Sequence, residues 1–177
     1  MKIIVIVISI LLIGNFLYQR TSLYFFDIPH FPLSQHLNKD NIVLEKGETF
    51  RLSVFAINKR VYYSSRDFKV AYVNLNGKVF AKKTGVTFIN VKVGKKTLRC
   101  KVRVIAISKK KLTLDVGEKY KLHVEGDGIL SNVTWKSSNS SIASVDDYGY
   151  IKAKRKGRTV ITAKVYGKKL TCKLKVE

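Results

Sequence analysis

An internal repeat limits the fold of this chain more than any other feature of its sequence. Residues of a first copy recur in the same order at a separation of 70 and, after a two-residue insertion, of 72. The matched pairs include Leu44 and Leu114, Gly47 and Gly117, Leu52 and Leu122, Ala71 and Ala143, Val73 and Val145, Gly77 and Gly149, Gly85 and Gly157, and Cys100 and Cys172. Composition alone does not produce so many matches in one order. We therefore expect two structural copies of one module.

Each copy alternates apolar and polar residues with a period of two. The segments 50–54, 120–124 and 172–176 each place apolar side chains on one face and polar or charged ones on the other. This period indicates strands, and turn residues such as Gly77 and Gly149 separate them. Because each strand has one apolar face, each copy must bury one face of its sheets, as a two-layer β-sandwich does.

The second copy contains a series of short motifs that lie in a fixed order. They are Leu-Asp-Val-Gly-Glu at 114–118, a segment at 133–139 that includes Trp135, Ile-Ala-Ser-Val-Asp at 142–146, and Lys-Gly-Arg-Thr-Val-Ile-Thr-Ala at 156–163. This order resembles the bacterial Ig-like domain of group 2 (Big2) over most of residues 112–177. The signature positions in the two copies are Gly47, Gly77, Gly117, Trp135, Ala143, Val145, Gly149 and Gly157. In the first copy, Tyr63 stands where the second has Trp135, and the following loop is two residues shorter.

The resemblance implies an Ig-like sandwich, an exported location and an interaction role, and it supplies no catalytic motif. We predict an all-β protein of two tandem Ig-like β-sandwich domains preceded by an N-terminal apolar helix. The expected parts are a signal-anchor or transmembrane segment at 1–26, a linker at 27–41, a divergent first domain at 42–108 and a second domain at 109–177. Few residues separate the last strand of the first copy from the first strand of the second, so we expect a stiff, end-to-end pair.

The apolar run from Ile3 to Tyr18 predicts membrane targeting. At ~1.5 Å per residue a helix of this length spans roughly 24 Å, somewhat less than the ~30 Å hydrocarbon core. No small-residue cleavage site follows the run, and Tyr18 and Arg20 are residues that favour a membrane interface. We predict an uncleaved single-pass anchor with the C-terminal domains outside the cell. A cleaved signal, which would give a secreted protein, is the alternative.

The sequence offers little for catalysis or metal binding. His30, His36 and His123 lie far apart, and the Asp146–Asp147 pair has too few oxygen ligands for calcium. Cys100 and Cys172 occupy equivalent inward positions in separate copies, where each is expected to be a small buried hydrophobe. We therefore expect no catalytic residues, no metal and no cofactor, and a protein that is not an enzyme.

Positive charge is the feature most open to a functional interpretation. The formal net charge is +22; residues 42–108 contain 15 Lys and Arg against 3 Asp and Glu, and residues 109–177 contain 16 against 7. Such a field attracts polyanions, among them wall teichoic acid, anionic lipid headgroups and extracellular DNA. The candidate polyanion-binding residues are Lys82, Lys83, Lys95, Lys96, Lys101, Arg103, Lys152, Lys154, Arg155, Lys156, Lys168 and Lys169, with Lys173 and Lys175 adding to the charge. A solvated surface that keeps the chain soluble is the alternative interpretation.

We predict a non-enzymatic binding, adhesion or spacer protein that presents two basic Ig-like modules at the bacterial envelope. Its expected partners are the membrane, through the N-terminal segment, and an anionic cell-wall polymer or another polyanion. Aromatic residues are not visibly interleaved with the lysines, so sequence-specific nucleic-acid recognition is not expected. The alternative is a structural subunit of a larger exported assembly that docks protein partners, which an exposed apolar patch shared by both copies would favour.

Overall fold

The computed structural model describes residues 35–56, 60–126 and 133–177, and all regular secondary structure within these ranges is β-strand. The all-β class is therefore confirmed for this part of the chain. The predicted anchor at 1–26 lies outside the described residues. No helix within the described ranges is long and apolar enough to cross a membrane.

The strands fall into two sets, in which β2–β9 correspond in order to β10–β17 and β1 has no counterpart. The first set is β1 (His36–Leu37), β2 (Asn41–Glu45), β3 (Thr49–Arg51), β4 (Val54–Phe55), β5 (Val61–Ser65), β6 (Ala71–Val73), β7 (Lys78–Ala81), β8 (Gly85–Val93) and β9 (Lys96–Ile107). The second set is β10 (Lys111–Leu114), β11 (Lys119–Lys121), β12 (Val124–Glu125), β13 (Thr134–Ser137), β14 (Ala143–Val145), β15 (Tyr150–Ala153), β16 (Gly157–Val165) and β17 (Lys168–Val176). We call β1–β9 the first unit and β10–β17 the second unit.

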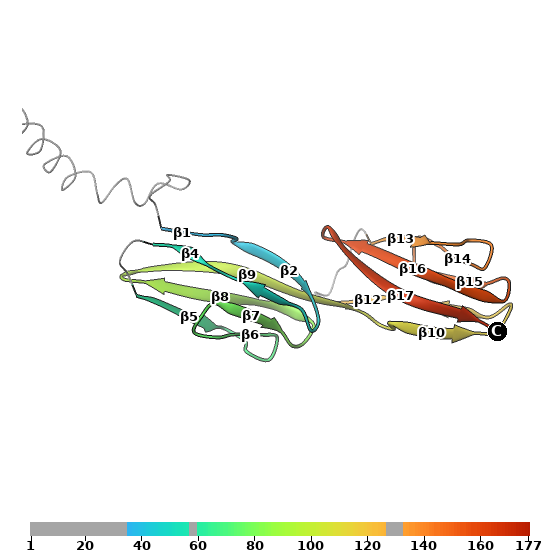
Figure 1. Ribbon diagram of the computed structural model, residues 1–177, viewed down its shortest axis with the longest axis horizontal. Helices are drawn as coiled ribbons and strands as arrows, with labels where there is room; N and C mark the ends of the chain where they lie inside the picture. The colour runs from blue at the N-terminus through green and yellow to red at the C-terminus, as the bar shows by residue number, and fades with distance from the viewer. Residues whose placement is uncertain (1–34, 57–59, 127–132) are drawn as a thin grey trace, which may run out of the picture.

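Each unit packs a larger sheet against a three-stranded one (Figure 1). In the first unit β9 and β8 form the centre of the larger sheet, with β2 and β5 beside them, and β3-β7-β6 is the second layer. In the second unit the corresponding sheets are β10-β17-β16-β13 and β11-β15-β14. The opening strand of each larger sheet runs parallel to the closing strand, as β2 does to β9 and β10 to β17, and the other pairs in these sheets are antiparallel.

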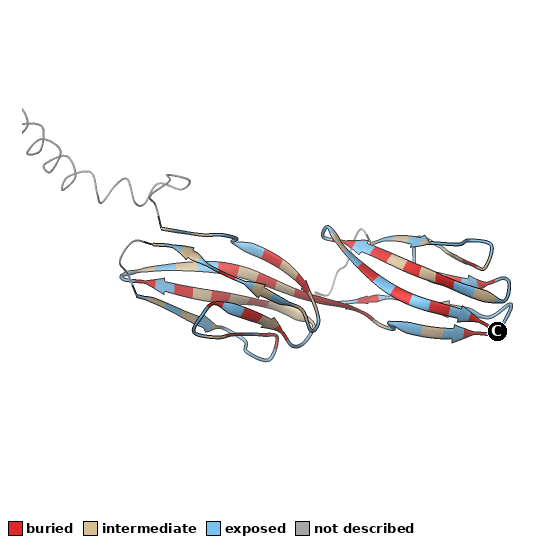
Figure 2. Cartoon of the chain, viewed as in Figure 1, coloured by how far each residue is buried: buried red, intermediate tan, exposed pale blue. Residues whose placement is uncertain are grey.

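Alternation along the strands builds one apolar core in each unit (Figure 2). In β17, for example, Cys172, Leu174 and Val176 are buried while Lys173 and Lys175 are exposed. The two thiols, Cys172 here and its counterpart in β9, are both free and fully buried, and they belong to different cores. The prediction of two separate buried cysteines is confirmed.

The prediction of continuous strands at 50–54 and 120–124 is wrong in both copies. Each segment forms two short strands, because the chain leaves the three-stranded sheet in the middle of the segment. Leu52 and Leu122 make the last contact with that sheet, where their N–H groups donate to the carbonyls of Gly77 and Gly149, both at 2.9 Å. The chain then pairs elsewhere, and β12 adds to β9 across the boundary between the units. Apolar alternation continues through the change of sheet, so the pattern gave no sign of it.

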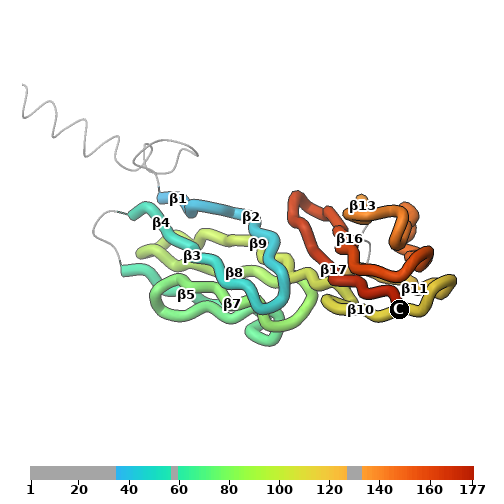
Figure 3. Tube along the Cα trace, turned by 45° about the vertical axis from the view of Figure 1, so that its right-hand side comes forward, coloured from blue at the N-terminus to red at the C-terminus, as the bar shows by residue number. Residues whose placement is uncertain are grey.

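Strand β9 joins the two units. It runs for 12 residues, and its last part contributes Ile105 and Ile107 to the core of the second unit. The units lie end to end along the long axis in both views, with the end of β9 between them (Figure 1, Figure 3). The N–H of Lys46 donates to the carbonyl of Ile105 at 2.8 Å, and Val43 packs against the second core. The two cores are therefore connected by packed side chains as well as by the chain itself.

Two ion pairs cross the same boundary. Lys110 Nζ lies 2.7 Å from Glu45 Oε1, and Lys168 Nζ lies 2.6 Å from Glu48 Oε2. Glu45 ends β2 and Glu48 lies in the turn after it, while Lys110 immediately precedes β10 and Lys168 begins β17. These contacts support the expectation of a stiff pair, which stays a prediction.

Candidate functional site

The outer face of the larger sheet in the second unit is strongly basic. Side chains at alternate positions of β10, β13, β16 and β17 point away from the core, and all seven of the basic ones among them are exposed. These residues, which we call the basic face, are Lys111, Lys136, Arg158, Lys164, Lys169, Lys173 and Lys175. In the described part of the chain, no outward position of these four strands holds Asp or Glu. Glu177, just after β17, pairs with Lys175.

Three pairs of like charges lie directly opposite each other on the basic face. Lys111 is in register with Lys173, and Lys164 is in register with Lys169. Arg158 is in register with Lys175. Like charges at such positions destabilise a sheet, whereas opposite charges would stabilise it by roughly 0.2–1 kcal/mol per pair. The arrangement therefore does not serve the stability of the sheet.

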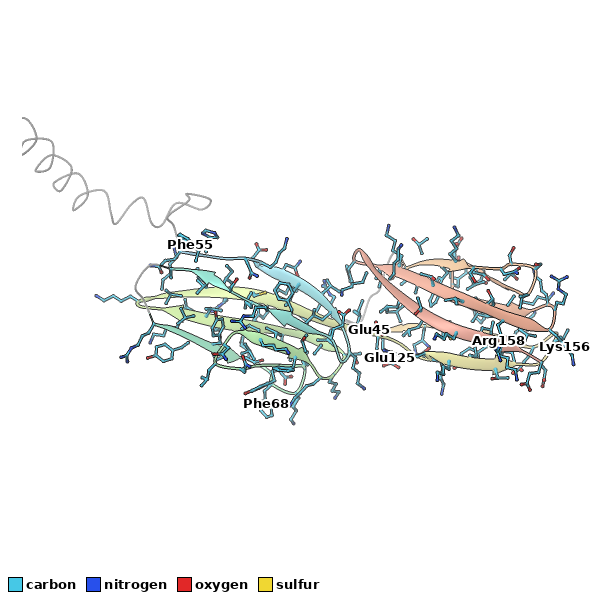
Figure 4. The ribbon with its side chains drawn as sticks, in the orientation of Figure 1. Glu45, Phe55, Phe68, Glu125, Lys156 and Arg158 are labelled. Carbon is cyan, nitrogen blue, oxygen red and sulfur yellow. The ribbon has the colours of Figure 1, made fainter. Side chains whose placement is uncertain are left out.

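An open hollow of about 570 Å³ lies at one end of the basic face. Strand β13 ends at Ser137, while β16 continues alongside β17 as far as Gly157, so one side of this end of the sheet has no neighbouring strand. Four cations from three strands line the hollow, together with three residues that carry hydroxyl groups and three aliphatic residues. The polar lining residues are Lys111, Arg158, Lys173, Lys175, Thr113, Ser138 and Thr159. Figure 4 labels Arg158 on this part of the second unit.

A network of hydroxyl groups holds the rim of the hollow. Thr159 is 5% exposed, and its Oγ1 accepts the Asn139 N–H at 3.0 Å and contacts Ser138 Oγ at 3.0 Å. Ser138 Oγ in turn accepts the N–H of Val160 at 2.9 Å. These bonds fix the loop after β13 to β16, so Ser138 has a defined position beside the hollow.

The first unit does not repeat the basic face. At the positions that correspond to Lys111, Arg158 and Val160 it has Asn41, Val86 and Phe88. Lys101 and Arg103, which correspond to Lys173 and Lys175, are partly buried, whereas the second-unit residues are exposed. The basic face is thus a property of the second unit, although the first copy has the larger net charge by residue count.

The twelve residues predicted to bind polyanions are dispersed over the molecule, and one of them, Lys169, lies on the basic face. Lys152 lies on the three-stranded sheet of the second unit, and Lys101 on β9 of the first. The loops after β7 and β15 hold Lys82, Lys83, Lys154, Arg155 and Lys156, the last of which is labelled in Figure 4, and Lys95 and Lys96 lie at the β8–β9 hairpin. Arg103 and Lys168 lie at the boundary between the units.

At that boundary the guanidinium carbon of Arg103 lies 4.1 Å from the centroid of the Tyr166 ring. Tyr166 and Gly167 form the tight turn between β16 and β17, with φ values of 49° and 77°. A turn of this kind needs two residues in the left-handed region, which is unusual for tyrosine. The turn places the ring over Arg103, so both Arg103 and Lys168 have contacts within the molecule.

Sequence reasoning missed four residues of the basic face: Lys111, Lys136, Arg158 and Lys164. The signal that could have found them is their outward position in the alternating strands, combined with the pairing of those strands. It also missed contacts between lysines and aromatic rings on the three-stranded sheets. Those contacts are Lys78 with Phe80 at 5.4 Å, Lys82 with Tyr72 at 5.5 Å and Lys121 with Tyr150 at 4.8 Å.

Within the described ranges, no group of three or more His, Cys, Asp or Glu side chains could hold a metal ion.

The strand order and the two-layer packing define an Ig-like β-sandwich protein. Residues 101–174 match the family model of the bacterial Ig-like domain (group 2), which confirms the resemblance predicted from the second copy. The match begins inside β9, in agreement with the packing of Ile105 and Ile107 in the second core. Membership of the first copy in the family stays a prediction.

One curated relative is an uncharacterised protein of Clostridium acetobutylicum, 33% identical over 143 residues. The alignment covers 72% of this chain and 15% of the relative, so the chain spans a small part of that protein's length. Among solved structures, a C-terminal fragment of intimin in complex with the intimin-binding domain of its translocated receptor has a TM-score of 0.49 at 18% identity, over 79% of this chain and 62% of that one. A large fragment of the S-layer protein SbsC has a TM-score of 0.37 at 22% identity, over 67% and 20%.

Proposed function

We propose that this chain is a non-enzymatic protein of the bacterial cell surface whose basic face binds an anionic polymer of the envelope. The observation that carries the proposal is the set of three like-charged pairs across β10, β16 and β17. Such pairs cost stability in the free protein, and a polyanion laid across the sheet would remove the repulsion. A surface that only maintained solubility would not require like charges in direct register.

The binding is electrostatic in origin. Several exposed ammonium groups on one face attract a polymer with regular negative charges and release its counterions, so the affinity falls steeply as salt rises. Exposed lysines individually contribute little, and the affinity comes from many contacts along one chain. The interaction is therefore selective for polymers over small anions in dilute solution.

The first unit acts as a spacer in this proposal. Its ion pairs and shared strand with the second unit favour a fixed orientation, which would hold the basic face away from the start of the domain pair. If residues 1–26 are a retained anchor, the basic face would stand outside the membrane at the distance of one unit. If they are a cleaved signal, the same pair of units would be secreted and would attach to the envelope through the polymer.

The alternative role, a structural subunit that docks protein partners, receives less support. Large exposed apolar residues occur in both units, but at positions that do not correspond in the repeat. In the first unit they include Phe68 at 62% and Tyr72 at 44% exposure, and their counterparts in the second unit are Ser140 and Ser144. The shared apolar patch expected for such a subunit is therefore not found at these positions.

Two charge variants test the proposal. One replaces four residues of the basic face, Lys136, Lys164, Lys169 and Lys173, with Gln. The matched control replaces four loop residues, Lys82, Lys83, Lys95 and Lys154, with Gln. Binding of the purified protein to immobilised teichoic acid is then measured at ~50 and ~200 mM salt, where polyanion affinities differ strongly.

We expect the basic-face variant to lose most of the binding and the salt dependence, and the control to keep most of both. Equal losses in the two variants would mean that the charge acts over the whole surface. Absence of binding by the unchanged protein at ~50 mM salt would reject the proposed function.

A further inference from the structure

We infer that the hollow at the end of the basic face is a site for the phosphate group of a polyol-phosphate polymer, in which short aliphatic alcohols are joined by phosphodiesters. The inference rests on the proposed function and names the polymer that the face selects. It follows from the charges and the apolar residues that line the hollow, and from the spacing of cations along the sheet.

The charges around the hollow suit an anion with several oxygens. Lys111, Arg158 and Lys173 come from three adjacent strands. Lys111 is in register with Lys173, and Arg158 is in register with Lys175, which is the next outward position along β17 and pairs with Glu177. The guanidinium group of Arg158 offers a planar fork of N–H donors, which matches two oxygens of a phosphate. None of the residues that line the hollow is Asp or Glu.

The apolar residues favour an aliphatic linker over a sugar ring or a nucleobase. Among the apolar residues that line the hollow, Val160 has the outward position between the cations, whereas Leu112 and Leu174 line it from positions that face the core. No aromatic residue is in the lining. Nucleobases bind proteins largely by stacking on aromatic side chains, so a site for single-stranded nucleic acid would be expected to contain such rings. Among the described residues, the lysine–aromatic contacts lie on the three-stranded sheets, in the other layer of each unit.

The distance between the cations along β17 allows one polymer chain to contact more than one of them. From Lys173 in the hollow, the outward positions continue through Thr171 to Lys169, which is in register with Lys164. With a rise of ~3.3–3.4 Å per residue, the Lys164–Lys169 pair lies roughly 13 Å from Lys173. A flexible phosphodiester chain held in the hollow can therefore reach a second pair of cations without leaving the sheet.

The test compares two pairs of substitutions that remove the same charge. The hollow variant carries Lys111→Gln and Arg158→Gln. The control variant carries Lys119→Gln and Lys152→Gln, which are in register with each other on the three-stranded sheet. Each purified full-length variant is titrated with poly(glycerol phosphate) and with polygalacturonate, a carboxylate polymer, at ~50 mM salt. Fluorescence of Trp135, the single tryptophan, verifies that the second unit is folded.

We expect the unchanged protein to prefer poly(glycerol phosphate), and the hollow variant to lose about tenfold or more in affinity for it. The control variant should lose less than about threefold. A third variant, Arg158→Lys, keeps the charge but not the fork, and it should lose part of the affinity for poly(glycerol phosphate) while binding more tightly than the hollow variant. Backbone amide shifts on addition of inorganic phosphate should be confined to the residues that line the hollow, with Lys111, Arg158 and Lys173 among them.

Three results would overturn the inference while leaving the proposed function in place: equal losses in the hollow and control variants, equal affinity of the unchanged protein for the two polymers, or phosphate shifts spread over both units. If the unchanged protein bound neither polymer at ~50 mM salt, the proposed function itself would fail.

Discussion

The indole ring of Trp135 lies directly against the α-carbon of Gly149. A Cβ atom built on Gly149 would lie 3.0 Å from both Cε2 and Cζ2 of the ring and 2.2 Å from the carbonyl oxygen of Leu122. The first unit has the same arrangement, in which a Cβ on Gly77 would lie 2.9 Å from Cζ of Tyr63. In each unit the aromatic ring therefore packs directly on the glycine, and any side chain at the glycine position would collide with the ring.

The substitution Gly149→Ala should strongly destabilise the second unit. The glycine has a φ of +84°, and the added methyl group would collide with backbone as well as with the indole ring, so we expect a loss of about 3 kcal/mol or more. Gly117→Ala is the matched control, because its φ is +91° but nothing lies within 4 Å of the added Cβ; strain alone should cost about 1–2 kcal/mol. Urea unfolding followed by Trp135 fluorescence compares the two, and equal losses would contradict the proposed clash.

The hydroxyl of Thr159 should contribute measurably to the second unit. Thr159→Val keeps the shape of the side chain but leaves the Asn139 N–H and the Ser138 hydroxyl without this buried acceptor. We expect a loss of about 1–3 kcal/mol in the free energy of unfolding. The corresponding Thr87 in the first unit accepts the Asp67 N–H, so Thr87→Val provides a comparison in which this one hydrogen bond is lost. A neutral effect of Thr159→Val would show that water replaces the bonds.

The contact between the units should weaken in acid. Burial raises the pKa of Glu48. Its hydrogen bonds to Lys168 and to the Glu45 N–H, together with the charges of Lys168 and Lys110, outweigh burial, so the pKa lies below its ordinary value of 4.5. A lowered carboxyl pKa stabilises the folded state above the unfolded value, and this contribution is lost as the pH falls from about 4.5 through the folded value. The effect is small because the side chain is 40% exposed.

The pH effect is measured as the difference in interdomain distance distribution between the unchanged protein and Glu48→Gln, with spin labels in the two units. At pH 7 the variant should show the broader distribution. Near pH 3 the two proteins should give the same distribution. A difference that persisted at pH 3 would mean that the ionisation of Glu48 is not responsible.

The two cysteines should be unreactive in the folded protein. Burial, with the nearby Asp40 charge, raises the pKa of Cys100 to about 12, and burial also raises the pKa of Cys172. Because the thiolate is the reactive form, a thiol reagent at pH 8 should modify neither residue until denaturant is added. Fast modification without denaturant would indicate that one unit opens readily, and mass spectrometry would identify which.

Much of the fold could be predicted because two signals are visible in the sequence itself: the alternation of apolar and polar residues along each strand, and the repetition of the module. The period of two predicts that Cys172, Leu174 and Val176 face inward. The turns are predicted at glycines because glycine readily adopts a left-handed φ. The change of sheet at Leu52 and Leu122 could not be predicted, since the alternation continues through it. The packing of Ile105 and Ile107 in the second core depends on where β12 pairs, which is a long-range contact.

The candidate site was less predictable than the fold. Runs such as Lys154-Arg155-Lys156 stand out in the sequence, but adjacent residues of a strand or loop point in different directions. The basic face is built from isolated cations on separate strands, and Arg158 meets Lys175 through strand register alone. Arg103 and Lys168 look equally available in the sequence, although the packing of the two units gives each a partner.

Parallel pairing of the first and last strands also determines how the chain would respond to mechanical tension. In the second unit β10 and β17 pair in register over Lys111–Leu114 and Lys173–Val176, and β2 and β9 do the same in the first unit. A pull on the two ends of a unit acts along these strands in opposite directions, so the hydrogen bonds between them are loaded together in shear and do not open one at a time. A load applied between the start of the first unit and the second unit would therefore be carried in shear by the parallel pair of β2 and β9.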